Sequence, residues 1–374
     1  MRQIGIIGAS GAVGGAALAL LRSDGYAPKA GYRTRRPGTD PETCWQAVDV
    51  YDRISLARFC SGCRVILNAA GPSGQIGDRV LRAADAAGAD YVDAFGGALL
   101  EQQLDARLPE TERRVVHSAG VYPGLSAMLP QYIVDKYFDH AHQLRGWTGG
   151  REHCTPAAGM DVLLSAIQGF GLAGAIWRKG VRVDSTSGLI RNVYIPGFPL
   201  RMCVQPFLSR EIERVARRLS LQDLQWHNVM PDAGPMEVMS RWVGRLGLSD
   251  PPDMLQLQQA TADLVRASDL DSAGQTPFYR QVVEIEGERH GKRRCVRAVL
   301  SAVDSYRVSG AVAACAVLHI LNIPCQPGSY TAADFLSTSS VLDKLRAWKV
   351  ISALSIDVVT PPESESIASE EGTL

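Results

Sequence analysis

Residues 5–23 read GIIGASGAVGGAALALLRS, and this stretch decides the fold. An apolar strand at residues 3–7 runs into Gly8, Gly11 and Gly14, and a helical run follows. Glycines at this spacing allow a tight turn, a close approach of the backbone to a pyrophosphate, and close packing of helix on strand. A strand before and a helix after them are the context that the motif requires. We predict that this turn binds a dinucleotide through Gly8, Ser10, Gly11, Ala12 and Val13.

The first 125 residues alternate short β-rich runs with Ala/Leu-rich stretches. This rhythm is typical of a parallel sheet with helical crossovers. Strands are predicted at residues 3–7, 29–32, 47–50, 65–69, 91–94 and 115–118. Six strands complete a doubly wound sheet, so the predicted fold class is α/β, with an N-terminal Rossmann domain over residues 1–130.

From about Leu144 the rhythm changes to longer strands. A hairpin is predicted with arms at 279–286 and 293–303 and a turn at 287–292. We therefore predict a second, α+β domain on a mixed or antiparallel sheet, made of residues 131–304 and 336–360. It is expected to bind the substrate and to form a homodimer interface.

The end of the chain contains two further segments. An Ala/Val-rich stretch at 305–321, almost free of charge, predicts a buried helix. This late helical region, about 305–335, is expected to pack back on the first domain. Residues 361–374 hold four Glu and no basic or aromatic residue, which predicts a disordered acidic tail.

The overall composition narrows the kind of partner. Lys plus Arg and Asp plus Glu number 39 each, so no net field favours nucleic acid or an anionic membrane. No apolar run approaches the roughly 20 residues that span a bilayer, and no signal peptide precedes the first strand. We expect a cytoplasmic protein with reduced cysteines, a small-molecule substrate and no metal site. The Cys60 and Cys63 pair lacks a second Cys/His pair at zinc spacing.

The end of the second predicted strand, AGYRTRRPG, bears on the choice of cofactor. An NAD site places a carboxylate here for the ribose 2′-OH, whereas an NADP site needs cations for the 2′-phosphate. The segment has Arg33, Arg35 and Arg36, and no acid before Asp40. A solvated basic loop is the alternative. We predict NADPH.

Small residues follow the fourth predicted strand, where the ribose and nicotinamide of a dinucleotide pass close to the backbone. Small residues also occur in sheets that bind no ligand. They indicate a cofactor site here only in combination with the glycine turn and the arginine-rich loop. The predicted contacts are Asn68, Ala69, Ala70, Gly71 and Pro72. Asp49 and Val50, at the end of the third predicted strand, are expected near the adenine.

Several segments together resemble the saccharopine dehydrogenase-like reductases. They are GIIGASGAVGG, AGYR, VILNAAGPSGQIGDRVLRAADAAGADYVDAFGG, SAGVYPGLSAMLP and SYRVSGAVAACAVLHIL followed by PGSYTAADFL. The resemblance implies an NADP-binding Rossmann domain, an inserted substrate and dimerisation domain, and reduction or formation of carbon–nitrogen bonds in amino-acid derivatives. One subgroup, the thiazoline reductases of pyochelin-type siderophore assembly, implies a substrate tethered to a carrier protein.

Reduction of C=N requires a hydride and a positioned acid. Tyr122, after the sixth predicted strand, is the first candidate, with ordinary packing as the alternative. His153, on a loop before a predicted helix, is the second, with simple solvation as the alternative. Asp93 is expected to be structural. Tryptophans crowd the middle region and could line an apolar pocket, although core packing explains most tryptophans: they are Trp147, Trp177, Trp226 and Trp242.

Two rival functions remain at this point. One is NADPH-dependent reduction of C=C or C=O, because the hydride chemistry uses the same cofactor site. The other is a non-catalytic NADP-binding regulator. The size of the middle region, more than a sensor needs, speaks against the regulator.

Overall fold

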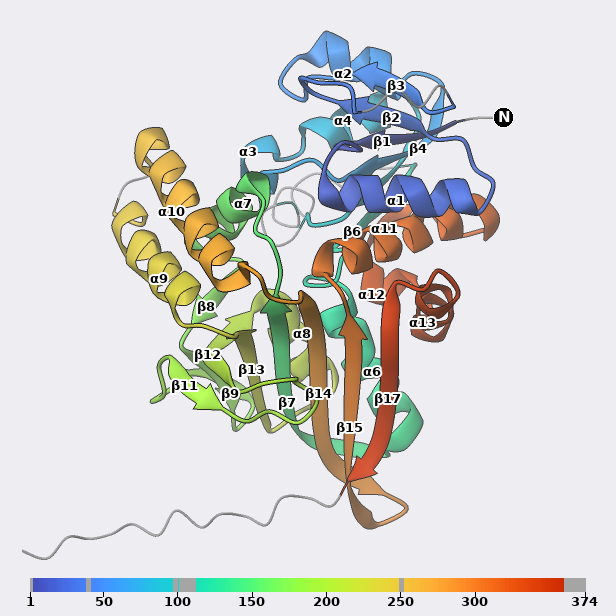
Figure 1. Ribbon diagram of the computed structural model, residues 1–374. Helices are drawn as coiled ribbons and strands as arrows, with labels where there is room; N and C mark the ends of the chain where they lie inside the picture. The colour runs from blue at the N-terminus through green and yellow to red at the C-terminus, as the bar shows by residue number, and fades with distance from the viewer. Residues whose placement is uncertain (1–2, 38–41, 97–99, 101–111, 249–251, 360–374) are drawn as a thin grey trace, which may run out of the picture.

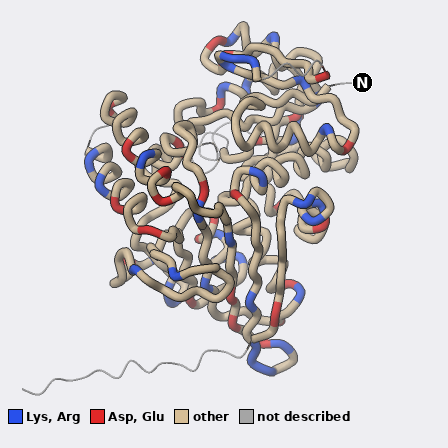
Figure 2. Tube along the Cα trace, in the orientation of Figure 1, with Lys and Arg blue, Asp and Glu red and all other residues tan. Residues whose placement is uncertain are grey.

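The computed structural model describes residues 3–37, 42–96, 100, 112–248 and 252–359, and it contains two sheets, one above the other in Figure 1. The predicted tail at 361–374 lies outside the described residues. No described helix is long and apolar enough to cross a bilayer. Figure 2 shows basic and acidic residues interspersed on both halves of the molecule.

The first sheet has seven strands, all paired in parallel, in the order β16-β6-β5-β4-β1-β2-β3. From β1 the chain winds outward through β2 and β3 on one side and β4 to β6 on the other, which is the doubly wound arrangement that we predicted. The strands are β1 Gln3–Ile7, β2 Lys29–Tyr32, β3 Cys44–Ala47, β4 Cys63–Asn68, β5 Asp90–Asp93, β6 Arg114–His117 and β16 Gly328–Thr331. The helices that accompany this sheet are α1 Ala12–Ser23, α2 Arg53–Cys60, α3 Ser73–Ile76 and α4 Arg79–Ala86.

The third strand ends earlier than predicted, at Ala47 instead of Val50. Asp49 leaves the extended conformation because its carboxylate accepts the N–H of Tyr51 and its own N–H donates to Ser55 Oγ. These bonds turn the chain toward α2. Val50 is buried in a core with Leu56 and Phe59.

The second sheet has ten strands, and it is mixed because β13 runs parallel to β7 while its other pairings are antiparallel. The strands are β7 His140–Arg151, β8 Gly171–Ala173, β9 Ala175–Arg178, β10 Val181–Asp184, β11 Ile190–Val193, β12 Met202–Ser209, β13 Asp223–Met230, β14 Phe278–Arg289, β15 Lys292–Ala302 and β17 Ile351–Val359. The helices of this half are α6 Leu125–Tyr137, α7 Pro156–Ile167, α8 Arg210–Arg218, α9 Gly234–Leu246, α10 Met254–Ser272 and α13 Thr338–Ala347.

The predicted hairpin is formed by β14 and β15, with arms longer than expected. Its turn shrinks to His290 and Gly291, which both have positive φ, 50° and 70°. Two left-handed residues in a two-residue turn match the twist of the flanking strands.

Helix α11, Ser305–Asn322, is the buried late helix that the sequence predicts. It packs on α1 at Gly310, where a Cβ atom would lie 2.6 Å from the carbonyl oxygen of Val13. The helical region is shorter than the predicted 305–335, because Pro324 and Pro327 follow and cannot extend a helix. Strand β16 and the short helix α12, Ala332–Phe335, take its place.

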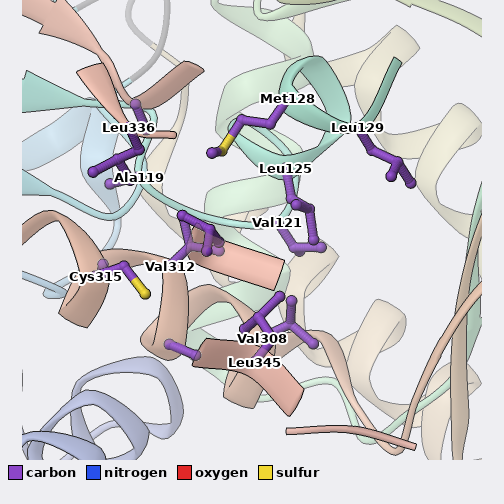
Figure 3. Close-up of a cluster of buried hydrophobic side chains, with 14 of the residues drawn as sticks. Ala119, Val121, Leu125, Met128, Leu129, Val308, Val312, Cys315, Leu336 and Leu345 are labelled. Carbon is purple, nitrogen blue, oxygen red and sulfur yellow. The ribbon is translucent and has the colours of Figure 1, made fainter. Parts of the chain in front are cut away.

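One core cluster contains side chains from both sheets. Figure 3 shows part of this cluster, where Val308, Val312 and Cys315 of α11 lie near Leu125 and Met128 of α6. The division into two domains at residue 130 stays a prediction. What the structure shows is that both sheets share this core.

Candidate functional site

The glycine turn between β1 and α1 leaves no room for side chains at two of its positions. Gly8 has φ +79°, and a Cβ atom there would lie 2.6 Å from the backbone nitrogen of Ala70. A Cβ atom at Gly14 would lie 2.3 Å from the carbonyl oxygen of Gly8. The turn is thereby pressed against the end of β4 and the start of α1, which is how the motif forms a phosphate cradle.

The N-terminus of α1 is open to an anion. Gly11 is the N-cap and offers no side chain, and the first turn has no acidic residue. The first N–H groups of a helix have no partner within it, and they carry the positive end of its dipole. Ser10, Gly11 and Ala12 are exposed here, whereas Val13 is buried. These residues fit the pyrophosphate of a dinucleotide.

The predicted cationic residues lie on the neighbouring loop. The N–H of Ala9 donates to the carbonyl of Gly31, 3.0 Å away, so the loop after β2 adjoins the glycine turn. Arg33, Arg35 and Arg36 are exposed, and none pairs with an acid of the described chain. Asp49 is exposed beyond them, at the same edge of the sheet.

The loop after β4 lies on the other side of the glycine turn. Asn68 is buried, with its amide donating to Asp93 and its oxygen accepting the N–H of Ala70. Asp93 also accepts from the Tyr91 hydroxyl and the Phe95 N–H, so its carboxyl holds the ends of β4 and β5 together. Ala69 and Ala70 contact Gly8 through their backbone, and Gly71 and Pro72 continue toward α3.

A cavity of about 360 Å³ opens between this edge and the second sheet. On the first side it is lined by Val13, Asn68, Asp93 and the loop of Tyr122. On the second it is lined by the end of β7, by α7 and by β13. Of the predicted cofactor contacts, Val13 and Asn68 reach it directly.

Tyr122 follows β6 and lies in the cavity wall, with the rings of Phe170 and Trp226 centred 5.6 and 5.9 Å from its own. Its hydroxyl is buried and has no hydrogen-bond partner among the described residues. Burial raises the pKa of the Tyr122 phenol well above its ordinary value, and the Glu211 carboxylate adds to this rise. The nearby Ser209 hydroxyl opposes the rise, although its position does not meet the geometry of a hydrogen bond. The phenol therefore keeps its proton.

The loop that carries Tyr122 is held from two sides. Glu211, buried at the start of α8, accepts the N–H of Gly124 at 2.8 Å and the hydroxyl of Ser126. The N–H of Val121 donates to Ser309 of α11. These three bonds fix the loop against elements outside the first sheet.

His153 does not reach the cavity. Its side chain is 65% exposed, and its Nδ1 lies 2.9 Å from a carboxylate oxygen of Asp269 on α10. Because β7 ends at Arg151, the chain turns so that His153 faces solvent while its neighbour Glu152 lines the cavity. The structure therefore does not bring the two predicted catalytic residues together.

Two carboxyl groups that sequence reasoning missed line the second wall. Asp161 of α7 accepts the N–H of Ser73 at 2.8 Å and its hydroxyl at 3.0 Å. Glu152 accepts the N–H and hydroxyl of Ser305, both at 2.7 Å. Asp161 is the one charged residue of α7, and a lone acid in an apolar helix is the signal that could have identified it.

Burial is the main cause of the perturbed acidity of both groups. It raises the pKa of Asp161 to about 6 against the opposing bonds from Ser73, and the Asp93 charge adds to the rise. Burial likewise raises the pKa of Glu152, again against the bonds from a serine. Strongly perturbed acids in a cleft mark a candidate functional site.

The four tryptophans of the middle region are not among the cavity-lining residues. Trp226 is fully buried behind Tyr122, and Trp177 and Trp242 belong to cores. Trp147 stacks on His227. Phenylalanine and methionine side chains line the apolar part instead: Phe95, Phe170, Phe207, Met230, Met236 and Met239.

The cysteines and one carboxylate cluster lie outside this cavity. All eight cysteines are free thiols, as expected, and burial raises the pKa of Cys60 to about 12. Glu284, Glu286 and Cys295 have ligand atoms within 4.8 Å of one another. Arg145 and Arg297 already pair with these two carboxylates, so cations of the chain itself occupy the place of a metal.

No protein-family model matches the sequence, and no curated protein matches it. Among solved structures, apo saccharopine dehydrogenase (L-Glu forming) from Saccharomyces cerevisiae is 12% identical, with a TM-score of 0.69 over 96% of this chain and 100% of that one. C. glutamicum DAP dehydrogenase in complex with DAP has a TM-score of 0.47 and 16% identity, covering 93% and 99% of the two chains. Amine dehydrogenase from Mycobacterium smegmatis has a TM-score of 0.47 and 12% identity, covering 90% and 96%. At these identities the first likeness shows a shared fold over the whole chain.

Proposed function

We propose that this chain is an NADPH-dependent oxidoreductase that reduces a C=N bond in an amino-acid-derived substrate. The observation that carries the proposal is the glycine turn, where Gly8 and Gly14 exclude any Cβ atom beside an uncapped helix N-terminus that leads into the cavity. Such a turn is suited to a pyrophosphate. The shared fold with a saccharopine dehydrogenase supports the same assignment.

Different residues along the edge of the first sheet would bind different parts of the cofactor. Ser10 and Ala12 would hold the pyrophosphate through backbone N–H groups, beside Gly11, whose own N–H donates to the carbonyl of Gly8. Arg33, Arg35 and Arg36 would hold the 2′-phosphate. Asn68 and its neighbours would pass beside the ribose and nicotinamide. When bound, the cofactor supplies a hydride at the cavity.

Tyr122 is our proposed proton donor. Its hydroxyl is buried, protonated and without a hydrogen-bond partner in the part of the chain that the structure describes, so it has a hydrogen to offer to a nitrogen placed in the cavity. Hydride addition to the carbon and proton transfer to the nitrogen together convert an imine to an amine. Glu211 and Ser309 keep the loop of Tyr122 in place for this contact.

NADPH oxidation with a panel of cyclic imines, including thiazolines, and of enones and ketones tests the proposal. Turnover of imines alone is the expected result. Turnover of enones or ketones instead would favour the rival reductase, and tight NADPH binding without any turnover would favour a regulator. A carrier-tethered thiazoline would be distinguished from a free one by activity that requires the carrier protein.

A further inference from the structure

The charges that line the cavity are all of one sign. Asp93, Glu152 and Asp161 line it, whereas no Lys, Arg or His is found among its lining residues in the described chain. The inference drawn from this rests on the proposed function, and it concerns the class of substrate that the cavity takes.

Asp161 is buried, with 8% of its surface exposed, and it has no cationic partner among the described residues. Among the described residues its hydrogen-bond donors are the N–H and hydroxyl of Ser73, which are neutral groups. They satisfy hydrogen bonds without cancelling the charge. Oδ2 lies on the side of Gly71, where a Cβ atom would be 3.4 Å away, so the carboxyl lies against the cofactor-side loop.

Glu152 repeats this arrangement at another point of the same cavity. Each of its oxygens accepts one hydrogen bond from Ser305, at the start of α11. The helix N-terminus stabilises a negative charge in part, but Ser305 brings no full positive charge. A carboxylate oxygen has two acceptor positions, so each oxygen keeps one for a ligand.

Buried carboxylates without a cation are costly, and proteins retain them where a ligand completes the pair. A ligand carboxylate in this cavity would meet two like charges and no cation. A ligand with a protonated nitrogen would meet two acceptors with free positions. The same cavity is also lined by Phe170, Phe207 and Met236, whose apolar side chains suit a hydrophobic group.

We propose that the substrate of this cavity carries a protonated amine or iminium nitrogen that Asp161 and Glu152 bind, an apolar or aromatic group beside Phe170 and Phe207, and no free carboxylate. An esterified, amidated or thioester-linked amino-acid derivative satisfies these three conditions. A free amino acid or 2-oxo acid does not.

The test compares two probes that share a ring and differ in charge, phenethylamine and 3-phenylpropionate. Their dissociation constants are measured by calorimetry on the full chain saturated with NADPH. The amine should bind at least tenfold more tightly. Equal affinity, preference for the carboxylate, or failure of both probes to bind overturns the proposal.

Asp161→Asn and Glu152→Gln identify the groups responsible. Each substitution keeps the shape and should reduce the preference for the amine at least threefold, while Asp269→Asn, an acid outside the cavity, should leave it unchanged. Circular dichroism establishes that each variant folds, and the wild-type comparison stands even if one does not. A preference that survives in both variants also overturns the proposal.

The oxidised nicotinamide is itself a cation, so NADP⁺ is the other ligand that these acids could serve. If they serve it, Asp161→Asn should weaken NADP⁺ more than NADPH and leave the probe preference intact, which would overturn the assignment to substrate. Failure of the proposed function is a separate result, because it is measured on the wild type without these probes, as absent NADPH binding in cofactor fluorescence or as absent turnover of the imine panel.

Discussion

The two walls of the cavity differ in whether backbone or side chains make the decisive contacts. The first wall adjoins the glycine turn after β1 and the small residues after β4, where backbone makes the closest contacts, and Val13 and Asn68 connect these segments to the cavity. The second consists of side chains on α7 and the ends of β7 and β13, with two acids, the buried Asp161 and the half-buried Glu152. A backbone wall can serve any dinucleotide, whereas a side-chain wall selects by charge and shape. The comparison indicates that cofactor binding and substrate selection can be changed independently.

Tyr122 stands where the two walls meet, and its replacement has the largest expected effect. Tyr122→Phe should lower kcat by about 10²- to 10⁴-fold, the usual contribution of a positioned acid. NADPH affinity and thermal stability should stay the same, because the lost hydroxyl makes no hydrogen bond to any described residue. The measurement is steady-state kinetics on the best imine substrate of the panel.

His153→Ala is the control for this experiment, since that imidazole lies outside the cavity. A loss of kcat in His153→Ala but not in Tyr122→Phe would remove the tyrosine from the mechanism. If neither changes kcat by more than about tenfold, the proton comes from water or arrives with the substrate.

Gly11→Val tests the backbone wall. A Cβ atom at Gly11 would approach nothing closer than 3.3 Å, so the apo protein should keep its melting temperature. The side chain would fill the space of the phosphate and should raise the NADPH dissociation constant by about 10²-fold or more, as the loss of two charge-assisted bonds would. Gly15→Ala, one turn further along α1, is the matched control and should bind normally.

Replacing Arg33 and Arg35 by Gln tests cofactor choice at the edge of the backbone wall. The double variant should bind NADPH about 10- to 100-fold more weakly, since each contact to phosphate contributes roughly 1.5 to 3 kcal/mol. NADH binding should hardly change. Arg58→Gln on α2 is the control for surface charge, and equal losses for NADPH and NADH would refute the assignment to the 2′-phosphate.

The smallest expected effect is on the free energy of unfolding, and it comes from Asp161 in the second wall. The pKa of Asp161, about 6 in the folded protein, lies above its ordinary 3.8. The folded state thus holds the extra proton between these values, and stability falls as pH rises from about 3.8 to about 6. The loss is complete above that window and is at most on the order of 3 kcal/mol.

Asp161→Asn should recover part of that loss, roughly 1 kcal/mol at pH 7, because the amide oxygen still accepts from Ser73 and no buried charge remains. The melting temperature should rise by a few degrees at pH 7 and not at pH 4. A variant less stable than the wild type at pH 7 would show that the carboxylate supports the fold.

What could be predicted from the sequence follows the same division. Gly8, Gly11 and Gly14 lie within seven residues, so their spacing alone predicts a turn that binds phosphate through its backbone. Asp161 and Ser73 are 88 residues apart, and nothing local to either indicates that they meet. His153 was chosen for its chemistry, but the end of β7 decides that Glu152 faces the cavity instead. Strand β16 was missed because it is only four residues long and its residues are mostly polar.

Strand β16 has a consequence for the order in which this chain acquires structure during synthesis. It pairs Thr331 with His117 at the edge of the first sheet, and α11, just before it, covers α1. The first sheet therefore cannot be completed until residue 331 has left the ribosome, by which time nearly all of the second sheet is available to fold. Contacts so distant in sequence form slowly and leave apolar surface uncovered meanwhile. Until α11 has been synthesised, the face of α1 that it covers stays exposed in the nascent chain. Chaperones that bind apolar surface can bind it during that time.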